Sequence, residues 1–589
     1  MKLIKPIALL TAMGITLAAT AADSAHTPPK EVNLKIVETS DVHGNFFPYN
    51  FITRTPWDGS MARIATLVDS LRATDGDESI ILLDNGDILQ GQPTVYYYNF
   101  VDTASRHIAS EIYDFMAYDA ATIGNHDVET GHNVYDRWIR GTNVPVLGAN
   151  VIDTSTGSPY LKPYTIIERQ GVKIAVIGML TPGIPMWLPE PLWSGLRFDD
   201  ITTSARKWID IVRQRENPDI IVGLFHSGHS DTNPRPGITE NACLDVARNV
   251  AGFDIILGGH DHQRDNRVVM NPDGKPVVIL NPANDAKTVG MVSITGNLDE
   301  DGKMTGKKVS GTLVDVDSLA PSQRFLDRFD ANRQAVEDFT GRIIGRSEGT
   351  FDSSESLFGP SAFMTLIHRL QLQLTGADIS FAAPLSIDAV IHPGEIRVSD
   401  MFGLYKYENM LLTMSLTGEE IRNYLEESYS IWVDTAATRP DGHLLLFRAR
   451  RPSVHDNRLR NPAYNFDSAA GIKYTVDITR PKVQRVNIMS MADGTPFDLK
   501  KTYTVAVNSY RGNGGGDLMT RGAGLSKEEL KRRTLSSTDA DLRYYMMKEI
   551  EKRGVIKPET DRNWRFVPEN LADRLAARDR KIIKGKQNR

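Results

Sequence analysis

The stretch Ile80-Ile-Leu-Leu-Asp-Asn-Gly-Asp87 joins an aliphatic run to a polar cluster that contains two aspartates and a glycine. A short aliphatic run bounded by turn residues is typical of a buried β-strand. Polar groups that directly follow such a strand lie at its carboxyl end, where α/β proteins bind their ligands. The stretch therefore predicts a sheet with a functional site along one edge.

The same arrangement recurs throughout the first half of the chain. Further strand-like runs occur at Leu34–Glu38, Ile174–Ile177, Ile220–Phe225, Ile255–Leu257 and Val277–Leu280. Amphipathic helical stretches such as Met61–Arg72 and Ser204–Arg215 lie between them. Alternation of strands and helices predicts an α/β fold for this half.

The second half has a mixed pattern. Strand-like runs at Met410–Ser415, Tyr474–Ile478 and Thr502–Val507 accompany helical stretches at Phe363–Leu374 and Gly418–Tyr429. This pattern favours an α+β domain. The predicted organisation is a signal peptide over residues 1–22, a first domain over 30–320, a linker helix over 321–344, a second domain over 345–570 and a solvated basic tail over 571–589.

Length and charge narrow the function classes. A chain of 589 residues exceeds what one hydrophobic core usually supports, so two domains are expected. The formal net charge of -6 gives no basic surface that would gather a nucleic acid polymer. Lys2 and Lys5 precede an apolar run too short to span a bilayer, and small residues follow at Ala19-Thr-Ala21. We therefore expect a cleaved signal peptide, a periplasmic or secreted protein and no stable membrane anchor.

Separate segments of the first half supply candidate metal ligands. These are Asp41, His43, Asp87, Asn125, His226, His260 and His262. Imidazole and carboxylate suit zinc, manganese or iron, and two adjacent ions need about this many protein groups, including one bridging carboxylate. Asp87 is the expected bridge. Taken singly, each short motif is more often a surface turn than a ligand, so only their combination carries the prediction.

The order of these motifs resembles a known family. Asp-x-His, Gly-Asp-x-x-x-Gly, Gly-Asn-His-Asp, a strand ending in His, and Gly-His-x-His together resemble the calcineurin-like metallophosphoesterases over residues 33–300. Leu404-Tyr-Lys-Tyr-Glu-Asn409, Tyr464-Asn-Phe-Asp467 and Asn508-Ser-Tyr-Arg-Gly-Asn-Gly-Gly515 resemble the C-terminal domain of bacterial 5′-nucleotidases and 2′,3′-cyclic-nucleotide 2′-phosphodiesterase/3′-nucleotidases. The resemblance implies a four-layer αββα catalytic domain followed by an α+β nucleotide-binding domain.

The resemblance also implies roles for the ligands. One divalent ion is expected on Asp41, His43, Asp87 and His262, and the other on Asp87, Asn125, His226 and His260. The two ions could be Zn, Mn, Fe, Co, Mg or Ca. A hydroxide activated by them is expected to attack phosphorus. His126 matches the family's catalytic histidine, and its carboxylate partner is expected at Glu129, where the family has aspartate; Asp127 lies close by.

Residues of the second domain are expected to hold a nucleoside. Tyr407 and Tyr510 match positions where the family stacks aromatic rings on the base, and Asn409 is expected at the base edge. Core packing of each tyrosine is the alternative. Ala377-Asp-Ile-Ser-Phe-Ala-Ala-Pro384 lacks the arginines with which 5′-nucleotidases clamp the phosphate.

These features together indicate the substrate class. They favour a 2′,3′-cyclic-nucleotide 2′-phosphodiesterase/3′-nucleotidase, a hydrolase acting on phosphoric ester bonds in nucleotide catabolism. The alternatives are a 5′-nucleotidase or nucleotide-sugar hydrolase and, from another class, a non-catalytic nucleotide-binding protein. The expected partner is the nucleotide substrate, and the sequence leaves the oligomeric state open.

Overall fold

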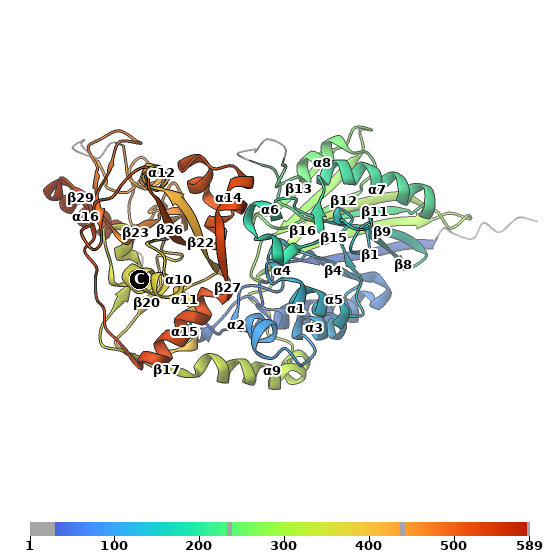
Figure 1. Cartoon of the computed structure of the whole chain (residues 1–589). Coiled ribbons are helices and arrows are strands. Elements are labelled where there is room, and N and C mark those ends of the chain that lie inside the picture. The colour runs from blue at the N-terminus through green and yellow to red at the C-terminus, as the bar shows by residue number, and fades with distance from the viewer. Residues whose placement is uncertain (1–29, 232–237, 436–441, 586–589) are drawn as a thin grey trace, which may run out of the picture.

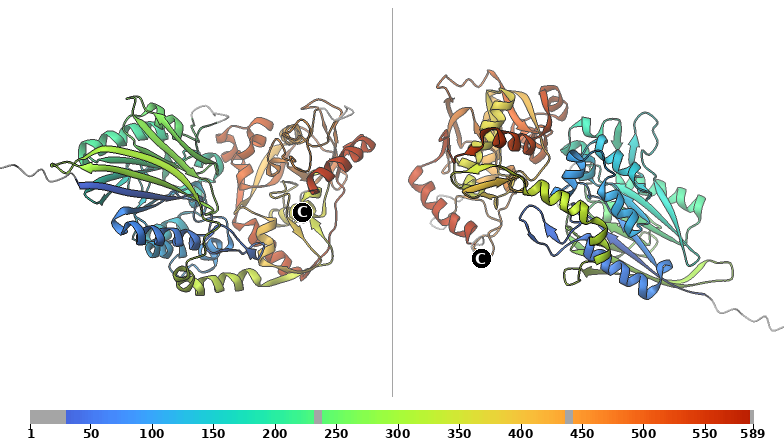
Figure 2. Two further views of the ribbon diagram at one scale, coloured as in Figure 1. Left: turned by 180° about the vertical axis from the view of Figure 1, so that it is seen from behind. Right: turned by 90° about the horizontal axis from the view of Figure 1, so that it is seen from below.

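The chain folds into two lobes joined by a long helix. The computed structural model describes residues 30–231, 238–435 and 442–585, so the predicted signal peptide lies outside the described residues. Figure 1 shows the N-terminal lobe on the right, the C-terminal lobe on the left and helix α9 (Gln323–Gly341) beneath both. Figure 2 shows from below how α9 runs from one lobe to the other.

Two six-stranded sheets stack face to face in the N-terminal lobe. Both have a parallel core in which the aliphatic runs of the sequence are buried. The first sheet has the order β16 (Met304–Asp315), β15 (Thr288–Leu298), β1 (Lys30–Thr39), β4 (Ile80–Asp84), β5 (Ala120–Thr122) and β6 (Val146–Leu147). The second has the order β13 (Arg264–Met270), β14 (Pro276–Pro282), β12 (Ile255–Gly258), β11 (Ile220–His226), β9 (Val172–Leu180) and β8 (Tyr164–Arg169).

Helices cover both outer faces of this pair of sheets (Figure 1). Helices α1 (Met61–Asp75), α3 (Ile108–Met116) and α5 (His132–Gly141) pack against the first sheet. Helices α7 (Ile201–Glu216) and α8 (Cys243–Asn249) pack against the second. The aliphatic side chains between the sheets form a separate core. The result is a four-layer lobe with helices outside and sheets inside.

A five-stranded sheet forms the centre of the C-terminal lobe. Its order is β23 (Ser468–Ala470), β19 (Ile379–Ala382), β26 (Thr502–Asn508), β22 (Met410–Thr417) and β27 (Thr534–Asp541). Two three-stranded sheets flank it, formed by β21 (Gly394–Arg397), β17 (Ile343–Ser347) and β28 (Val555–Ile556), and by β25 (Val486–Met491), β24 (Ile472–Asp477) and β29 (Trp564–Val567). The helices are α10 (Ala362–Thr375), α11 (Val398–Leu404), α12 (Gly418–Trp432), α13 (Ser509–Gly512), α14 (Lys527–Arg533), α15 (Leu542–Arg553) and α16 (Glu569–Lys584).

The basic segment at the end of the chain differs from the prediction. It was expected as a solvated tail, but through Lys584 it forms helix α16. Leu575, Ala576 and Ile583 recur on one face of this helix and are buried against the C-terminal core. Because helical spacing places these apolar residues on one face, their burial outweighs the repulsion among the surrounding basic side chains.

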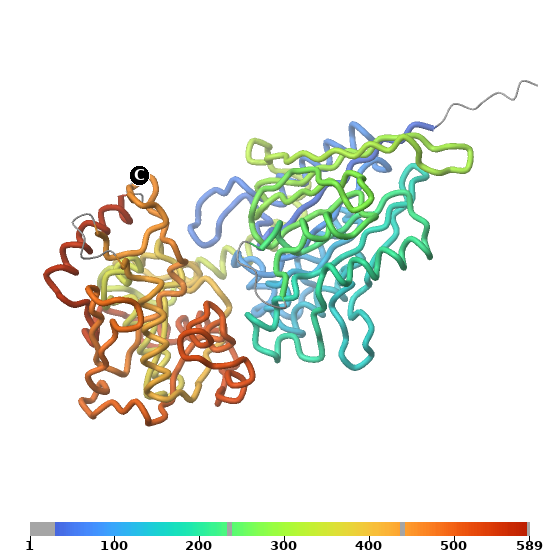
Figure 3. Tube along the Cα trace, turned by 90° about the horizontal axis from the view of Figure 1, so that it is seen from above, coloured from blue at the N-terminus to red at the C-terminus, as the bar shows by residue number. Residues whose placement is uncertain are grey.

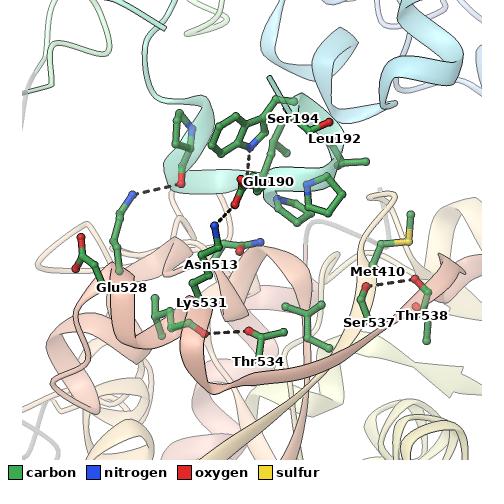
Figure 4. Close-up of a pocket in the computed structure, with 18 residues that line it drawn as sticks. Glu190, Leu192, Ser194, Met410, Asn513, Glu528, Lys531, Thr534, Ser537 and Thr538 are labelled. Atoms are coloured by element: carbon green, nitrogen blue, oxygen red, sulfur yellow. Dashed lines mark hydrogen bonds and ion pairs between the residues drawn. The ribbon is translucent and has the colours of Figure 1, made fainter. Parts of the chain in front are cut away.

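The two lobes touch through side chains at several points. Tyr96 of α2 (Pro93–Tyr96) donates a hydrogen bond to Asp541 at 3.2 Å, and its ring meets Phe402 edge to face. Figure 3 shows the lobes side by side from above. Figure 4 shows Glu190 paired with Lys531 of α14. Both side chains line a cavity of about 890 Å³ to which the two lobes contribute.

His368 in the C-terminal core makes stability depend on pH. It lies between Ser380 and Ser468, at 2.9 and 3.1 Å, and burial lowers its pKa from 6.5 to about 4. The unfolded chain therefore binds a proton below pH 6.5 that the folded chain does not. We expect this residue alone to lower the free energy of unfolding by about 2 kcal/mol between pH 7 and pH 5.

Urea denaturation at pH 7 and pH 5 measures this contribution. A His368→Gln variant cannot titrate, so it should lose about 2 kcal/mol less than the wild type over the same interval. Equal losses in the two proteins would show that His368 does not carry the effect.

Candidate metal centre

The predicted ligands lie together at the carboxyl ends of strands from both sheets. Asp41 and His43 follow β1, and Asp87 follows β4. Asn125 begins the short helix α4 (Asn125–Glu129) directly after β5, His226 ends β11, and His260 and His262 follow β12. Parallel neighbours bring these strand ends to one edge. Residues separated by more than 200 positions therefore share one site.

Two groups of side chains have the spacing of metal ligands. Ligand atoms of Asp41, His43 and His262 lie within 4.8 Å of one another, as do those of Asp41, Asp87 and His226. Asp41 belongs to both groups, whereas Asp87, the expected bridge, belongs to the second group only. Ligands of one ion at about 2.0–2.2 Å from it lie roughly 3–4 Å apart, which these groups allow.

Asn125 extends the second group. Its Oδ1 lies 3.1 Å from Nε2 of His226 and 2.7 Å from Nδ1 of His260. The buried Oδ2 of Asp87 accepts no hydrogen bond, although Nε2 of His226 is 3.2 Å away. Buried carboxylate oxygens are normally satisfied, so this oxygen is available for a cation. The donor set of carboxylate, amide oxygen and imidazole fits divalent metal ions.

Contacts behind the histidines fix which ring nitrogen faces the centre. His43 donates from Nδ1 to the carbonyl of Gln90 at 3.0 Å, and His226 donates from Nδ1 to the carbonyl of Asn85 at 2.6 Å. Nε2 of His260 lies 3.0 Å from a carboxylate oxygen of Glu240. Such outer contacts orient metal-binding imidazoles. The sequence had not indicated Gln90, Asn85 or Glu240, because two act through the backbone and the third lies in a loop.

Burial and neighbouring charges have opposite effects on the pKa values of the cluster. Burial opposes ionisation of Asp87, but the charges of His226 and His126 hold its pKa well below the ordinary value. Burial also lowers the pKa of His43 to about 4, so its imidazole is neutral at pH 7. Neutral imidazole and ionised carboxylate are the forms that bind metal ions, so His43 and Asp87 are in the binding form. The charge of Asp87 raises the pKa of His226 to about 10 against the effect of burial, so His226 would release its proton to a bound ion.

The backbone is strained at five of the predicted ligands. Left-handed φ angles between 49° and 70° occur at Asp41, His43, Asp87, His260 and His262. Residues other than glycine seldom adopt these angles, and their occurrence concentrates at functional sites. The adjacent Gly86 also has a positive φ, and a Cβ there would lie 2.5 Å from the backbone nitrogen of Gly124. Side-chain patterns alone do not reveal this geometry.

His126 lies beside the centre and is paired with Glu129. Its Nδ1 is 2.5 Å from a carboxylate oxygen of Glu129, and its backbone N–H donates to Asp87 at 2.7 Å. Asp127 is fully engaged elsewhere, since its carboxylate accepts backbone N–H groups of Asp87, Ile88, Leu89 and Gly124. The carboxylate beside His126 is therefore that of Glu129.

A cavity of about 340 Å³ connects this centre with the C-terminal lobe. Asn125, His126, Glu129 and His260 line it from one side. The predicted substrate residues Tyr407, Asn409 and Tyr510 line it from the other. The sequence prediction missed several further lining residues, among them Trp187, Leu192, Glu240, Glu408 and Tyr464. Trp187 follows strand β9 and its ring centroid lies 5.6 Å from that of His260, so its position after a strand was the available signal.

His229 lies outside the ligand groups. Its Nδ1 is 2.7 Å from Asp265, a residue of the edge strand β13. His229 is therefore paired with a carboxylate and belongs to neither group. Among the residues that the structure describes, no helix combines the length and apolar character needed to cross a membrane.

Models of two known families match this chain, one in each lobe. The model of the calcineurin-like phosphoesterases matches residues 34–264, and that of the 5′-nucleotidase C-terminal domain matches residues 343–521. A 2′,3′-cyclic-nucleotide 2′-phosphodiesterase/3′-nucleotidase of Yersinia enterocolitica is 25% identical, with 98% of this chain and 93% of that protein covered. Protein UshA of Escherichia coli is 25% identical, with 86% and 90% covered.

The solved structures show the same architecture. A putative 5′-nucleotidase from Staphylococcus aureus superposes with a TM-score of 0.71 at 22% identity, covering 91% of this chain and 99% of that one. A 5′-nucleotidase precursor from Thermus thermophilus gives a TM-score of 0.61 at 23% identity, covering 91% and 100%. These matches confirm the predicted two-domain fold.

Proposed function

The chain belongs to the calcineurin-like metallophosphoesterases that carry a 5′-nucleotidase C-terminal domain, and from this we propose that it hydrolyses 2′,3′-cyclic nucleotides and 3′-nucleotides. Phosphoester hydrolysis follows from the family. The nucleotide class is supported by relatives of similar length, among them the enzymes from Yersinia enterocolitica and Haemophilus influenzae that bear this name.

One observation carries the substrate proposal. A single cavity is lined by candidate metal ligands on one lobe and by Tyr407 and Tyr510 on the other. A nucleotide fits both ends of this cavity, because its phosphate can bind the metal centre and its planar base can stack on the aromatic rings.

The charge of the cavity favours 2′,3′-cyclic nucleotides over nucleoside monophosphates. Its described lining includes Glu129, Glu240 and Glu408 but neither arginine nor lysine. A 2′,3′-cyclic phosphate carries one negative charge, so it needs no cationic clamp beyond the ions and is repelled least by these carboxylates.

The side chains have separate roles in this proposal. Asp41, His43, Asp87, Asn125, His226, His260 and His262 would hold two divalent ions. Such ions neutralise phosphoryl oxygens and lower the pKa of water. Glu129 holds Nδ1 of His126, so Nε2 can donate a proton to the leaving oxygen. Tyr407 and Tyr510 would stack on the base, and Asn409 would bind its edge.

The 5′-nucleotidase activity is the second candidate. It is supported by the C-terminal domain match and by relatives such as the 5′-nucleotidase of Vibrio vulnificus, which is 26% identical. Export through the predicted N-terminal signal is part of the proposal, and N-terminal sequencing of the mature protein tests it.

Chelation followed by substrate profiling tests the activity. Removal of divalent ions should reduce turnover by at least ~100-fold, and re-addition of a single transition-metal ion should restore it. The restored enzyme should have a kcat/KM at least about tenfold higher for 2′,3′-cyclic AMP and 3′-AMP than for 5′-AMP. Full activity after chelation, or a preference for 5′-AMP, would contradict the proposal.

A further inference from the structure

Three tyrosines surround one part of the cavity. The ring of Tyr464 meets that of Tyr407 at 6.4 Å and 83°, and that of Tyr510 at 6.3 Å and 86°. All three side chains line the cavity. Tyr464 therefore stands nearly perpendicular to both rings and about equally far from each.

We propose that Tyr464 is a specificity-determining residue that forms the third wall of a slot for the base, and that buried Arg511 positions it. This inference rests on the proposed function, because it assigns a residue to the base half of the same substrate. A slot with two faces accepts any planar ring. A third wall limits how far the ring can enter and contacts its edge, where edge-to-face packing is favourable.

Arg511 joins the segment that carries Tyr464 to the glycine loop that follows Tyr510 and helix α13. Its guanidinium donates to the carbonyl of Tyr464 at 2.9 Å and to that of Gly515 at 2.5 Å. It also donates to both carboxylate oxygens of Asp467, at 2.9 and 3.2 Å, and to the side chain of Asn465 at 3.2 Å. Arg511 is 1% exposed. A planar guanidinium with several fixed donors can hold two loops in one geometry.

The glycines after Arg511 make this packing possible. A Cβ on Gly515 would lie 2.4 Å from the ring of Tyr510. A Cβ on Gly516 would lie 2.2 Å from both Arg511 and Asn465. The glycine run of the sequence therefore lets the chain pass between the ring of Tyr510 and the guanidinium that anchors Tyr464.

Tyr464→Ala tests the third wall. We expect KM for 2′,3′-cyclic AMP to rise about 5- to 10-fold with kcat within twofold, because only contacts to the base edge are lost. Tyr464→Phe is the matched control and should stay within twofold. For methyl riboside 2,3-cyclic phosphate, which has no base, Tyr464→Ala should leave KM within twofold of the wild type.

A second variant tests the role of Arg511. Arg511→Lys keeps a charge beside Asp467 but cannot reach both loops, so KM for 2′,3′-cyclic AMP should rise as in Tyr464→Ala. In the double variant, the rise in KM should be smaller than the two single effects combined, because both changes remove the same wall. The thermal midpoint shows whether Arg511→Lys folds. If it does not fold, the comparison of Tyr464→Ala with Tyr464→Phe decides whether Tyr464 forms the third wall.

The outcomes separate this inference from the proposed function. A wild type that hydrolyses 2′,3′-cyclic AMP no better than the base-free ester would overturn the nucleotide assignment itself. A wild type that prefers the nucleotide, combined with an unchanged KM in Tyr464→Ala, would overturn only the third wall. An equal rise in KM for the base-free ester would also overturn it.

Discussion

An Asp87→Asn variant is expected to lose at least ~10³-fold in kcat/KM. The carboxylate is buried at 1% exposure, one oxygen lies 3.2 Å from His226 and the other accepts the backbone N–H of His126 at 2.7 Å. Asparagine keeps the shape of the side chain but removes the charge that two neighbouring cations require. Metal content measured by mass spectrometry should fall below two equivalents together with activity.

A matched control separates this effect from general damage to the fold. Asp119 is also mostly buried and accepts the backbone N–H of Leu82, but it precedes β5 and therefore lies at the opposite edge of the sheet. Asp119→Asn should keep both metal equivalents and activity within about threefold, because no ligand changes. Two bound equivalents and near-normal activity in Asp87→Asn would refute the assignment of Asp87.

Replacing His126 with glutamine should lower kcat by ~10²–10⁴-fold while leaving metal content unchanged. The imidazole lines the cavity, and its Nδ1 is held by Glu129 at 2.5 Å. KM should change little if His126 acts only in the transition state. Glu129→Gln should lose only about tenfold, since an amide oxygen can still accept from Nδ1.

The leaving group distinguishes proton donation from other roles of His126. p-Nitrophenolate departs without protonation, so the His126→Gln loss should shrink on a p-nitrophenyl ester if His126 donates a proton. His132→Gln is the matched control, because this histidine pairs with Asp136 away from the cavity. An equal loss on both substrates would contradict proton donation, and a loss of bound metal would contradict a role separate from the ligands.

Most strands of the N-terminal lobe could be predicted from the sequence, because each depends on a short run of neighbouring residues. Aliphatic runs such as Ile80–Leu83 are buried on both faces, so pattern alone identifies the strands. Polar residues that follow them converge because parallel strands end at one edge. The ligand candidates could therefore be found without knowing any distance between them.

Other features could not be predicted because they depend on the folded surroundings. The sequence offered both Asp127 and Glu129 to His126, and only the backbone N–H groups that occupy Asp127 decide between them. Tyr464 approaches Tyr407 across long sequence separation, so no periodicity connects them. Helix α16 was missed because the charge of its basic residues masked the apolar face.

The left-handed backbone at five of the predicted ligands carries a cost in stability. Asp41, His43, Asp87, His260 and His262 all hold this geometry, and each would be relieved of strain of order 1 kcal/mol by a change to glycine. The five strained angles therefore lower the stability of the fold where they place candidate ligands, so relaxed angles at these positions would add stability and remove the side chains that hold the ions.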